Sequence, residues 1–258
     1  MSLFEELIED KELDDKIVKS FKSKDSLSNQ IFDGEKGEFK MRDDIRKKLL
    51  DISDNFIDSL GVEFFIHDLV LTGSLANYNW SNFSDVDLHI IVDFDEIIEG
   101  KPDSESFITI FKEFFDAKER VWNERYNIKI KGYDVEIYVQ DINQPHVSSG
   151  VYSILHNKWI VEPNIKSPNI DDKKILDKSE YYAKKIDELV QLSTKEDVSD
   201  KLDTLRKKIK EFRQSGLESG GEYSYENLTF KLLRRNGYFG KLLKLKTDIT
   251  DKKLSITQ

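Results

Sequence analysis

The sequence contains no cysteine, only two methionines and only four prolines. Without cysteine the chain can form neither a disulfide nor a thiolate metal site, which fits a reducing compartment. Its four histidines, His67, His89, His146 and His156, are too widely scattered for a zinc site of the usual spacing. Redox chemistry at thiols and thiolate-bound zinc are therefore excluded.

Long apolar runs are also missing. No stretch approaches the roughly 20 apolar residues that a membrane-spanning helix needs. The N-terminal sequence MSLFEELIEDKELDDK is acidic, where a signal peptide would be basic and then apolar. We therefore expect a soluble, cytoplasmic protein without a membrane partner. A chain of 258 residues with 38% hydrophobic content can bury the core of one large domain or two small ones.

The charge is unevenly distributed. The formal net charge of −10 argues against a protein that coats nucleic acid. Residues 228–258 nevertheless hold eight Lys or Arg against two Asp, a net of +6, which leaves −16 on residues 1–227. This end of the chain is where a triphosphate or an RNA would bind, with Lys231 and Arg235 as candidate ligands. The alternative is a basic helix face that only contacts water.

The order of predicted elements is mixed α and β first and all-α last. Apolar residues recur at helical spacing over 41–60, and Gly61 is a natural helix terminator. Short apolar runs predict strands within 63–73 and 85–94, followed by a helix over 107–122. Hairpins are predicted at 131–132 and 156–157. Two long helices follow. The first covers about 172–214, with its continuity in question near Ser193, and the second covers 225–247. These elements indicate an arm (1–40), an α+β core (41–165) and a C-terminal helical domain (166–258).

Two aspartates lie one residue apart at the start of the second strand. Side chains alternate along a strand, so Asp85, Asp87 and His89 share one face, while Val86, Leu88 and Ile90 face the opposite way. Neighbouring carboxylates repel unless a cation lies between them. Hard oxygen ligands at this spacing are what Mg²⁺ requires, together with water and substrate phosphates. The pattern predicts a divalent metal site; a strand with one solvated face is the alternative.

Two further segments extend this site. In YDVEIYV, Glu136 points away from an apolar face, so a neighbouring strand can supply a third carboxylate. Asp134 shares that face and is the alternative to Glu136, which we prefer for its apolar neighbours. Gly73 and Ser74 close the preceding strand, and such a turn exposes backbone N–H groups and a hydroxyl that can bind phosphate oxygens.

Together these residues resemble the signature of the DNA polymerase β-like nucleotidyltransferase superfamily. That signature is Gly followed by Gly or Ser, a gap of about ten residues, Asp-hydrophobic-Asp and a later carboxylate. The resemblance covers roughly residues 41–140 and matches at Gly73, Ser74, Asp85, Asp87 and Glu136. It implies a mixed sheet flanked by helices. Three longer stretches, around residues 29–52, 71–94 and 148–163, also resemble uncharacterised nucleotidyltransferase-like proteins of tailed bacteriophages, which would place the protein in a bacterial host cell.

The family implies in-line nucleotidyl transfer with two Mg²⁺ ions, which Mn²⁺ is able to replace. One metal would bind Asp85, Asp87 and Glu136 and activate the attacking hydroxyl; the other, on Asp85 and Asp87, would hold the triphosphate. Ser74 would contact the β- or γ-phosphate. An NTP is the implied substrate, and the acceptor is an RNA, a protein or a small molecule. A catalytically inactive binding or structural protein, and a synthase of oligonucleotide second messengers, remain alternatives.

Other side chains near the motif allow two interpretations. His89 lies on the face of the aspartates, where it has either a catalytic or a structural role. Tyr78, Trp80 and Phe83, in the loop between the strands, either cover a base or ribose or pack internally.

Overall fold

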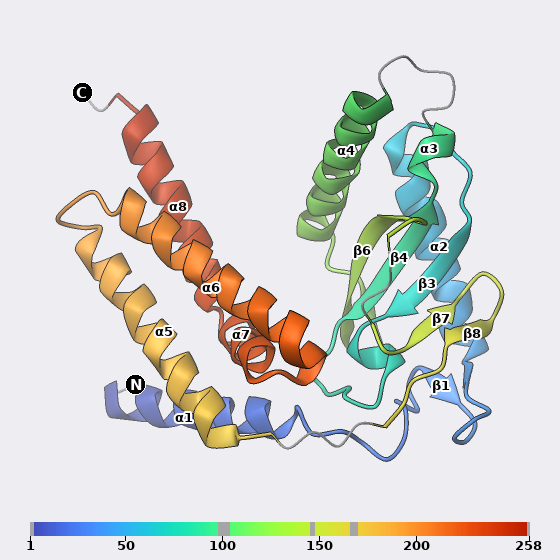
Figure 1. The fold of residues 1–258 in the computed structure, drawn as a ribbon, viewed down its shortest axis with the longest axis horizontal. Coiled ribbons are helices and arrows are strands. Elements are labelled where there is room, and N and C mark those ends of the chain that lie inside the picture. Colours follow the sequence, from blue (N-terminus) through green and yellow to red (C-terminus); the bar gives the residue numbers. More distant parts are fainter. Residues whose placement is uncertain (1–2, 98–103, 145–147, 166–169, 257–258) are drawn as a thin grey trace. The chain divides into compact units, whose positions relative to one another are not determined.

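The computed structural model describes residues 3–97, 104–144, 148–165 and 170–256, and shows an α+β protein (Figure 1). Contacts divide the chain into two compact units, residues 23–166 and residues 1–22 together with 167–258. The mixed sheet flanked by helices and the C-terminal helical region are confirmed. The expected arm 1–40, however, is split between the units. Ile17, Val18 and Phe21 are buried, and helix α1 (Leu3–Lys19) contacts two helices of the C-terminal region.

The sheet of residues 23–166 has six strands in the order β5-β6-β4-β3-β7-β8. Their bounds are β3 (Asp68–Thr72), β4 (Val86–Val92), β5 (Lys129–Ile130), β6 (Tyr133–Asp141), β7 (Val151–Ser153) and β8 (Lys158–Val161). β4 and β6 pair in parallel, and the other pairs are antiparallel. A separate two-stranded ribbon joins β1 (Phe32–Asp33) and β2 (Lys40–Met41). Central strand β4 therefore lies between β3, which Gly73 and Ser74 directly follow, and β6, which carries Glu136.

Two helices cover one face of this sheet. They are α2 (Asp43–Leu60) and α4 (Ser104–Arg125). The short helix α3 (Phe94–Ile97) precedes α4 in the chain. The buried side chains of α2 and Phe115 of α4 pack against Val86, Leu88 and Ile90 of β4 in one apolar cluster. Burial of this continuous apolar surface is the main stabilising term. The acidic face of β4 is consequently the opposite one.

The predicted hairpins and some helix ends follow from special backbone positions. Lys131 and Gly132 adopt φ of 51° and 90° between β5 and β6, and Asn157 adopts 54° before β8. Both predicted hairpins are confirmed. The prediction of one continuous helix over 225–247 is wrong, because Gly237 at φ 75° breaks it. An Asn-Gly pair favours this left-handed geometry.

The helical unit contains α1 and four C-terminal helices. These are α5 (Asp172–Leu192), α6 (Ser199–Gly220), α7 (Tyr225–Arg235) and α8 (Tyr238–Leu254), with a 3₁₀ turn η2 (Gly221–Tyr223) between α6 and α7. Their apolar faces meet in one buried cluster that includes Ile186, Ile209 and Leu233. Among the described residues, no helix combines the length and the apolar character needed to cross a membrane.

Helix α4 also buries an acidic side chain. Glu119 is 9% exposed, and its carboxylate accepts a hydrogen bond from the backbone N–H of Val139 in β6. The pKa of Glu119 is raised from 4.5 to about 7, mainly because the carboxyl group is buried. The hydrogen bond from Val139 lowers this pKa, and the nearby charge of Asp116 raises it slightly. The folded chain therefore binds this proton more tightly than the unfolded chain does.

This pKa predicts a stability that falls as the pH rises. Between pH 4.5, the ordinary pKa, and about pH 7, the folded state holds the Glu119 proton and the unfolded state does not. Stability is thus progressively lost across this window, by up to about 3 kcal/mol. Glu119→Gln keeps an acceptor for Val139 without a charge, so it should be more stable than the wild type at pH 8 and similar at pH 4.5. Urea unfolding at several pH values measures the difference, and parallel curves for the two proteins would contradict the prediction.

Candidate functional site

The turn after β3 brings a glycine against the first strand of the acidic motif. Gly73 adopts φ 72° and ψ −159°, a region that residues with a side chain hardly populate. A Cβ built on Gly73 would lie 1.8 Å from Oδ2 of Asp87. Thr72, one residue earlier, is the register partner of Asp87 across the β3–β4 pair. Glycine is required here because the backbone turns directly over a carboxylate.

Strand β4 places its acidic residues on the face opposite the core. Asp85 lies just before the strand and, like Asp87 and His89, is half-buried, whereas Val86 and Leu88 are at most 1% exposed. Asp87 is the direct register partner of Glu136 in the parallel strand β6. Paired residues of neighbouring strands have backbones about 5 Å apart and side chains on the same face. The structure thus brings Gly73, Asp87 and Glu136 together from three separate segments.

The carboxylate of Glu136 has a neighbour that the sequence did not indicate. The Tyr138 hydroxyl donates a hydrogen bond to Oε2 of Glu136, and the Tyr138 ring lies 5.0 Å from the His89 ring, centroid to centroid. All three side chains project from the same face of β4 and β6. Because Tyr138 is two residues from Glu136, strand alternation could have identified it.

Asp134, the alternative to Glu136, has a different environment. It is exposed, and its Oδ1 lies 2.5 Å from Nζ of Lys129 on the adjoining strand β5. Its register partner is also Lys129, not a residue of β4. Asp134 therefore belongs to the β5–β6 hairpin, and Glu136 is the residue of this pair that lies beside Asp87.

Ser74 begins a 3₁₀ turn, η1 (Ser74–Ala76), that is tied to the start of β4. Its hydroxyl donates to Oγ of Ser84, 2.7 Å away, and Ser84 also accepts from the backbone N–H of Ser81 at 2.9 Å. The side-chain amide of Asn77 donates to the carbonyl oxygen of Gly73 at 2.8 Å. These bonds hold the Gly-Ser turn beside the aspartates. The expected contact of Ser74 with a phosphate remains a prediction.

Two of the three loop aromatics, Tyr78 and Trp80, have mainly packing roles. Tyr78 is 2% exposed and belongs to the core cluster of the sheet. The indole N–H of Trp80 donates to the carbonyl oxygen of Ser26 at 2.8 Å. Of the two interpretations that the sequence allows, the structure favours internal packing for Tyr78 and Trp80.

The donor set suits a hard divalent cation. Asp85, Asp87 and Glu136 offer only carboxylate oxygens, which Mg²⁺ and Mn²⁺ prefer over nitrogen or sulfur. The missing side chain at Gly73 leaves room for the Asp87 carboxylate directly under the turn. These residues therefore fit a metal-dependent phosphate site.

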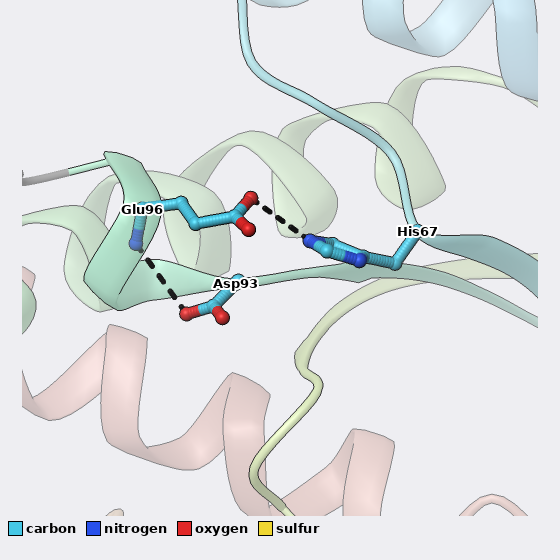
Figure 2. A group of neighbouring side chains, drawn as sticks. All are labelled: His67, Asp93 and Glu96. Atoms are coloured by element: carbon cyan, nitrogen blue, oxygen red, sulfur yellow. Dashed lines mark hydrogen bonds and ion pairs between the residues drawn. The ribbon is translucent and has the colours of Figure 1, made fainter.

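A second group of neighbouring side chains lies at the C-terminal end of β4, the end away from Asp85 and Asp87 (Figure 2). Within the described ranges, His67, Asp93 and Glu96 form a group whose ligand atoms lie within 4.8 Å of one another. His67 Nε2 lies 3.0 Å from Oε2 of Glu96, and Asp93 Oδ1 accepts from the backbone N–H groups of Asp95 and Glu96. A hydrogen bond between His67 and Glu96 and a helix cap by Asp93 account for this arrangement without a metal. It lies about 20 Å along β4 from Asp87.

The basic C-terminal residues are partly engaged within their own unit. Nη1 of Arg235 donates to Oγ of Ser20 at 3.1 Å, and the guanidinium lies 5.2 Å from the ring centroid of Phe21. Nζ of Lys241 lies 2.8 Å from Oδ1 of Asp187. Lys231 is on α7 and half-buried. Binding of a triphosphate or RNA by Lys231 and Arg235 stays a prediction.

Comparisons with known proteins add little. No model of a protein family and no curated protein matches the chain. Among solved structures, it is similar to the STING-associated CdnE c-di-GMP synthase from Capnocytophaga granulosa, with 14% sequence identity, 81% of this chain and 84% of that chain covered, and a TM-score of 0.22. A similarity at this level assigns no function, which has to be inferred from the residues of the site.

Proposed function

We propose that the protein is a metal-dependent nucleotidyltransferase, which moves a nucleoside monophosphate from an NTP to a hydroxyl acceptor and releases pyrophosphate. The observation that supports it most strongly is the convergence of Gly73, Asp87 and Glu136. The first two are separated by 13 residues and the last two by 48, yet the glycine backbone lies against Asp87 and Asp87 is in register with Glu136. A strand face that only contacts water would need neither a glycine packed against the Asp87 carboxylate nor the pairing of Asp87 with Glu136.

In the proposed reaction, the acceptor oxygen forms a bond to the α-phosphorus of the NTP while the bond from that phosphorus to the pyrophosphate oxygen breaks. Asp85, Asp87 and Glu136 would hold two Mg²⁺ ions, which when bound lower the pKa of the acceptor hydroxyl and neutralise charge on the departing pyrophosphate. The Gly73-Ser74 turn would orient the triphosphate. Glu136 is the candidate to take the hydroxyl proton, and the hydrogen bond from Tyr138 orients its carboxylate.

The test is incubation of the protein with each α-labelled NTP and Mg²⁺ or Mn²⁺, with and without total RNA. Transfer predicts release of pyrophosphate and a labelled product. A labelled RNA or protein identifies a macromolecular acceptor, whereas a soluble cyclic or linear oligonucleotide identifies a second-messenger synthase. No product with any NTP, with or without RNA, would favour a catalytically inactive binding or structural protein.

Substitutions on β6 test the choice of the third carboxylate. Glu136→Gln should reduce turnover by about 100-fold or more, with a much smaller change in the KM for NTP, because the triphosphate is held mainly by Asp85, Asp87 and the turn. Asp134→Asn, a matched change two residues away, removes only an exposed ion pair and should leave both kinetic constants nearly unchanged. Steady-state kinetics of the two variants decides. The reverse pattern would assign the role to Asp134.

A further inference from the structure

Strand β6 carries Glu136 and, within the part of the chain that the structure describes, has no full strand partner on its outer side. On the inner side it pairs with β4 from Val135 to Asp141. On the outer side β5 pairs only with Tyr133 and Asp134, and the N–H of Val135 donates to the carbonyl of Ile128 at 2.9 Å. Backbone N–H and C=O groups alternate in direction along a strand. From Ile137 onward, the outward groups of β6 therefore need partners of another kind.

Two side chains of α4 supply those partners. The side-chain oxygen of Asn123 accepts from the N–H of Ile137 at 3.0 Å, and its side-chain nitrogen donates to the carbonyl of Ile137 at 2.9 Å. The amide of Asn123 thus reproduces the pair of bonds that a neighbouring strand would make. Four residues earlier, and hence on the same helix face, Glu119 accepts from the N–H of Val139.

These contacts adjoin the carboxylate of the proposed site. Ile137 directly follows Glu136 and is held at both backbone groups by one side chain. Val139 directly follows Tyr138, whose hydroxyl donates to Glu136. The contacts from α4 therefore fix the backbone on both sides of Tyr138, within three residues of Glu136.

We propose that Asn123 and Glu119 are positioning residues, which fix the backbone of β6 so that Glu136 is held at a set distance from Asp87 for joint binding of a divalent metal. This inference rests on the proposed function. An apolar helix face would cover the strand without desolvating a carboxylate, and α4 already packs through Phe115. The polar pair instead fixes one register and one separation, a role that hydrogen-bonded buried groups fulfil better than apolar contacts do.

The probe is Mn²⁺ alone, and binding is measured by electron paramagnetic resonance at a temperature where every variant is folded. Asn123→Leu and Glu119→Leu remove the hydrogen bonds at similar volume and should each weaken Mn²⁺ binding about 10-fold, as loss of supporting groups around a metal site commonly does. Glu119→Gln retains an acceptor for Val139 and should bind like the wild type. Glu124→Leu, on an exposed position of the same helix, is the matched control. If Asn123→Leu does not fold, Asn123→Asp, which keeps only the acceptor, should still weaken binding several-fold.

The outcomes separate this inference from the proposed function. Wild-type Mn²⁺ affinity in folded Asn123 and Glu119 variants, with reduced melting temperature only, would overturn the positioning role and leave the proposed function standing. If Asp87→Asn binds Mn²⁺ as well as the wild type, the proposed metal site is wrong and the positioning role fails with it. Weakened binding in both leucine variants and in Asp87→Asn, but not in Glu124→Leu, supports the proposal.

Discussion

Asp87→Asn should lower nucleotidyl transfer by about a thousand-fold, and Asp85→Asn should act similarly, because each removes one negative ligand from the place where charge must be neutralised. The fold should persist, since Asp87 is only half-buried and the buried residues of β4 are all apolar: Val86, Leu88, Ile90, Ile91 and Val92. Steady-state transfer assays together with circular dichroism separate loss of chemistry from loss of structure.

Asp93→Asn is the matched control for these aspartates. It makes the same chemical change at the residue that directly follows β4, at the end of the strand away from the proposed site. Asparagine can still cap α3 through its side-chain oxygen. Its transfer rate should stay within about twofold of the wild-type rate, since such surface changes are usually nearly neutral. Wild-type rates in Asp85→Asn and Asp87→Asn would contradict the assignment of the metal site.

Gly73→Ala should damage both stability and activity. At φ 72° and ψ −159° an alanine is strained by about 1–3 kcal/mol. Its Cβ would also lie 1.8 Å from Oδ2 and 2.8 Å from Cγ of Asp87, so the carboxylate has to move away from its place beside Glu136. We expect a melting temperature lower by about 2–12 °C and a loss of transfer comparable to that of Asp87→Asn.

Gly61→Ala separates backbone strain from displacement of the carboxylate. Gly61 ends α2 at φ 70°, and a Cβ there would meet nothing within 4 Å. This variant should lose about 1 kcal/mol of stability and no activity. If Gly73→Ala transferred as fast as Gly61→Ala does, the close approach of the turn to Asp87 would have no part in catalysis.

The sequence predicted the elements whose signals are local. Alternation over Val86 to Ile90 placed the apolar and acidic residues of β4 on opposite faces, and the periodicity up to Gly61 predicted α2. The break at Asn236-Gly237 also has a local signal, because that pair favours a left-handed residue, but the helical spacing on either side predicts one continuous helix. Local patterns therefore predict an element correctly where periodicity and turn residues agree, and fail where they conflict.

Features that depend on distant segments could not be predicted in this way. Asn123 and Glu119 look like ordinary polar residues of an amphipathic helix, because helical periodicity carries no information about an unpaired edge of β6. No local pattern in the N-terminal segment shows that Ile17 and Val18 are buried in the unit that residues 1–22 form with residues 167–258. The sequence favours Glu136 over Asp134 only through its apolar neighbours, whereas the pairing of β6 with both β5 and β4 separates the two residues.

The most direct test of the central claim is a crystal structure of the protein with Mn²⁺ and a nonhydrolysable NTP, in which anomalous scattering locates the metal. We expect manganese bound by Asp85, Asp87 and Glu136, with the triphosphate against the Gly73-Ser74 turn. Manganese at His67, Asp93 and Glu96, or a nucleotide bound away from Gly73, would contradict the proposed function.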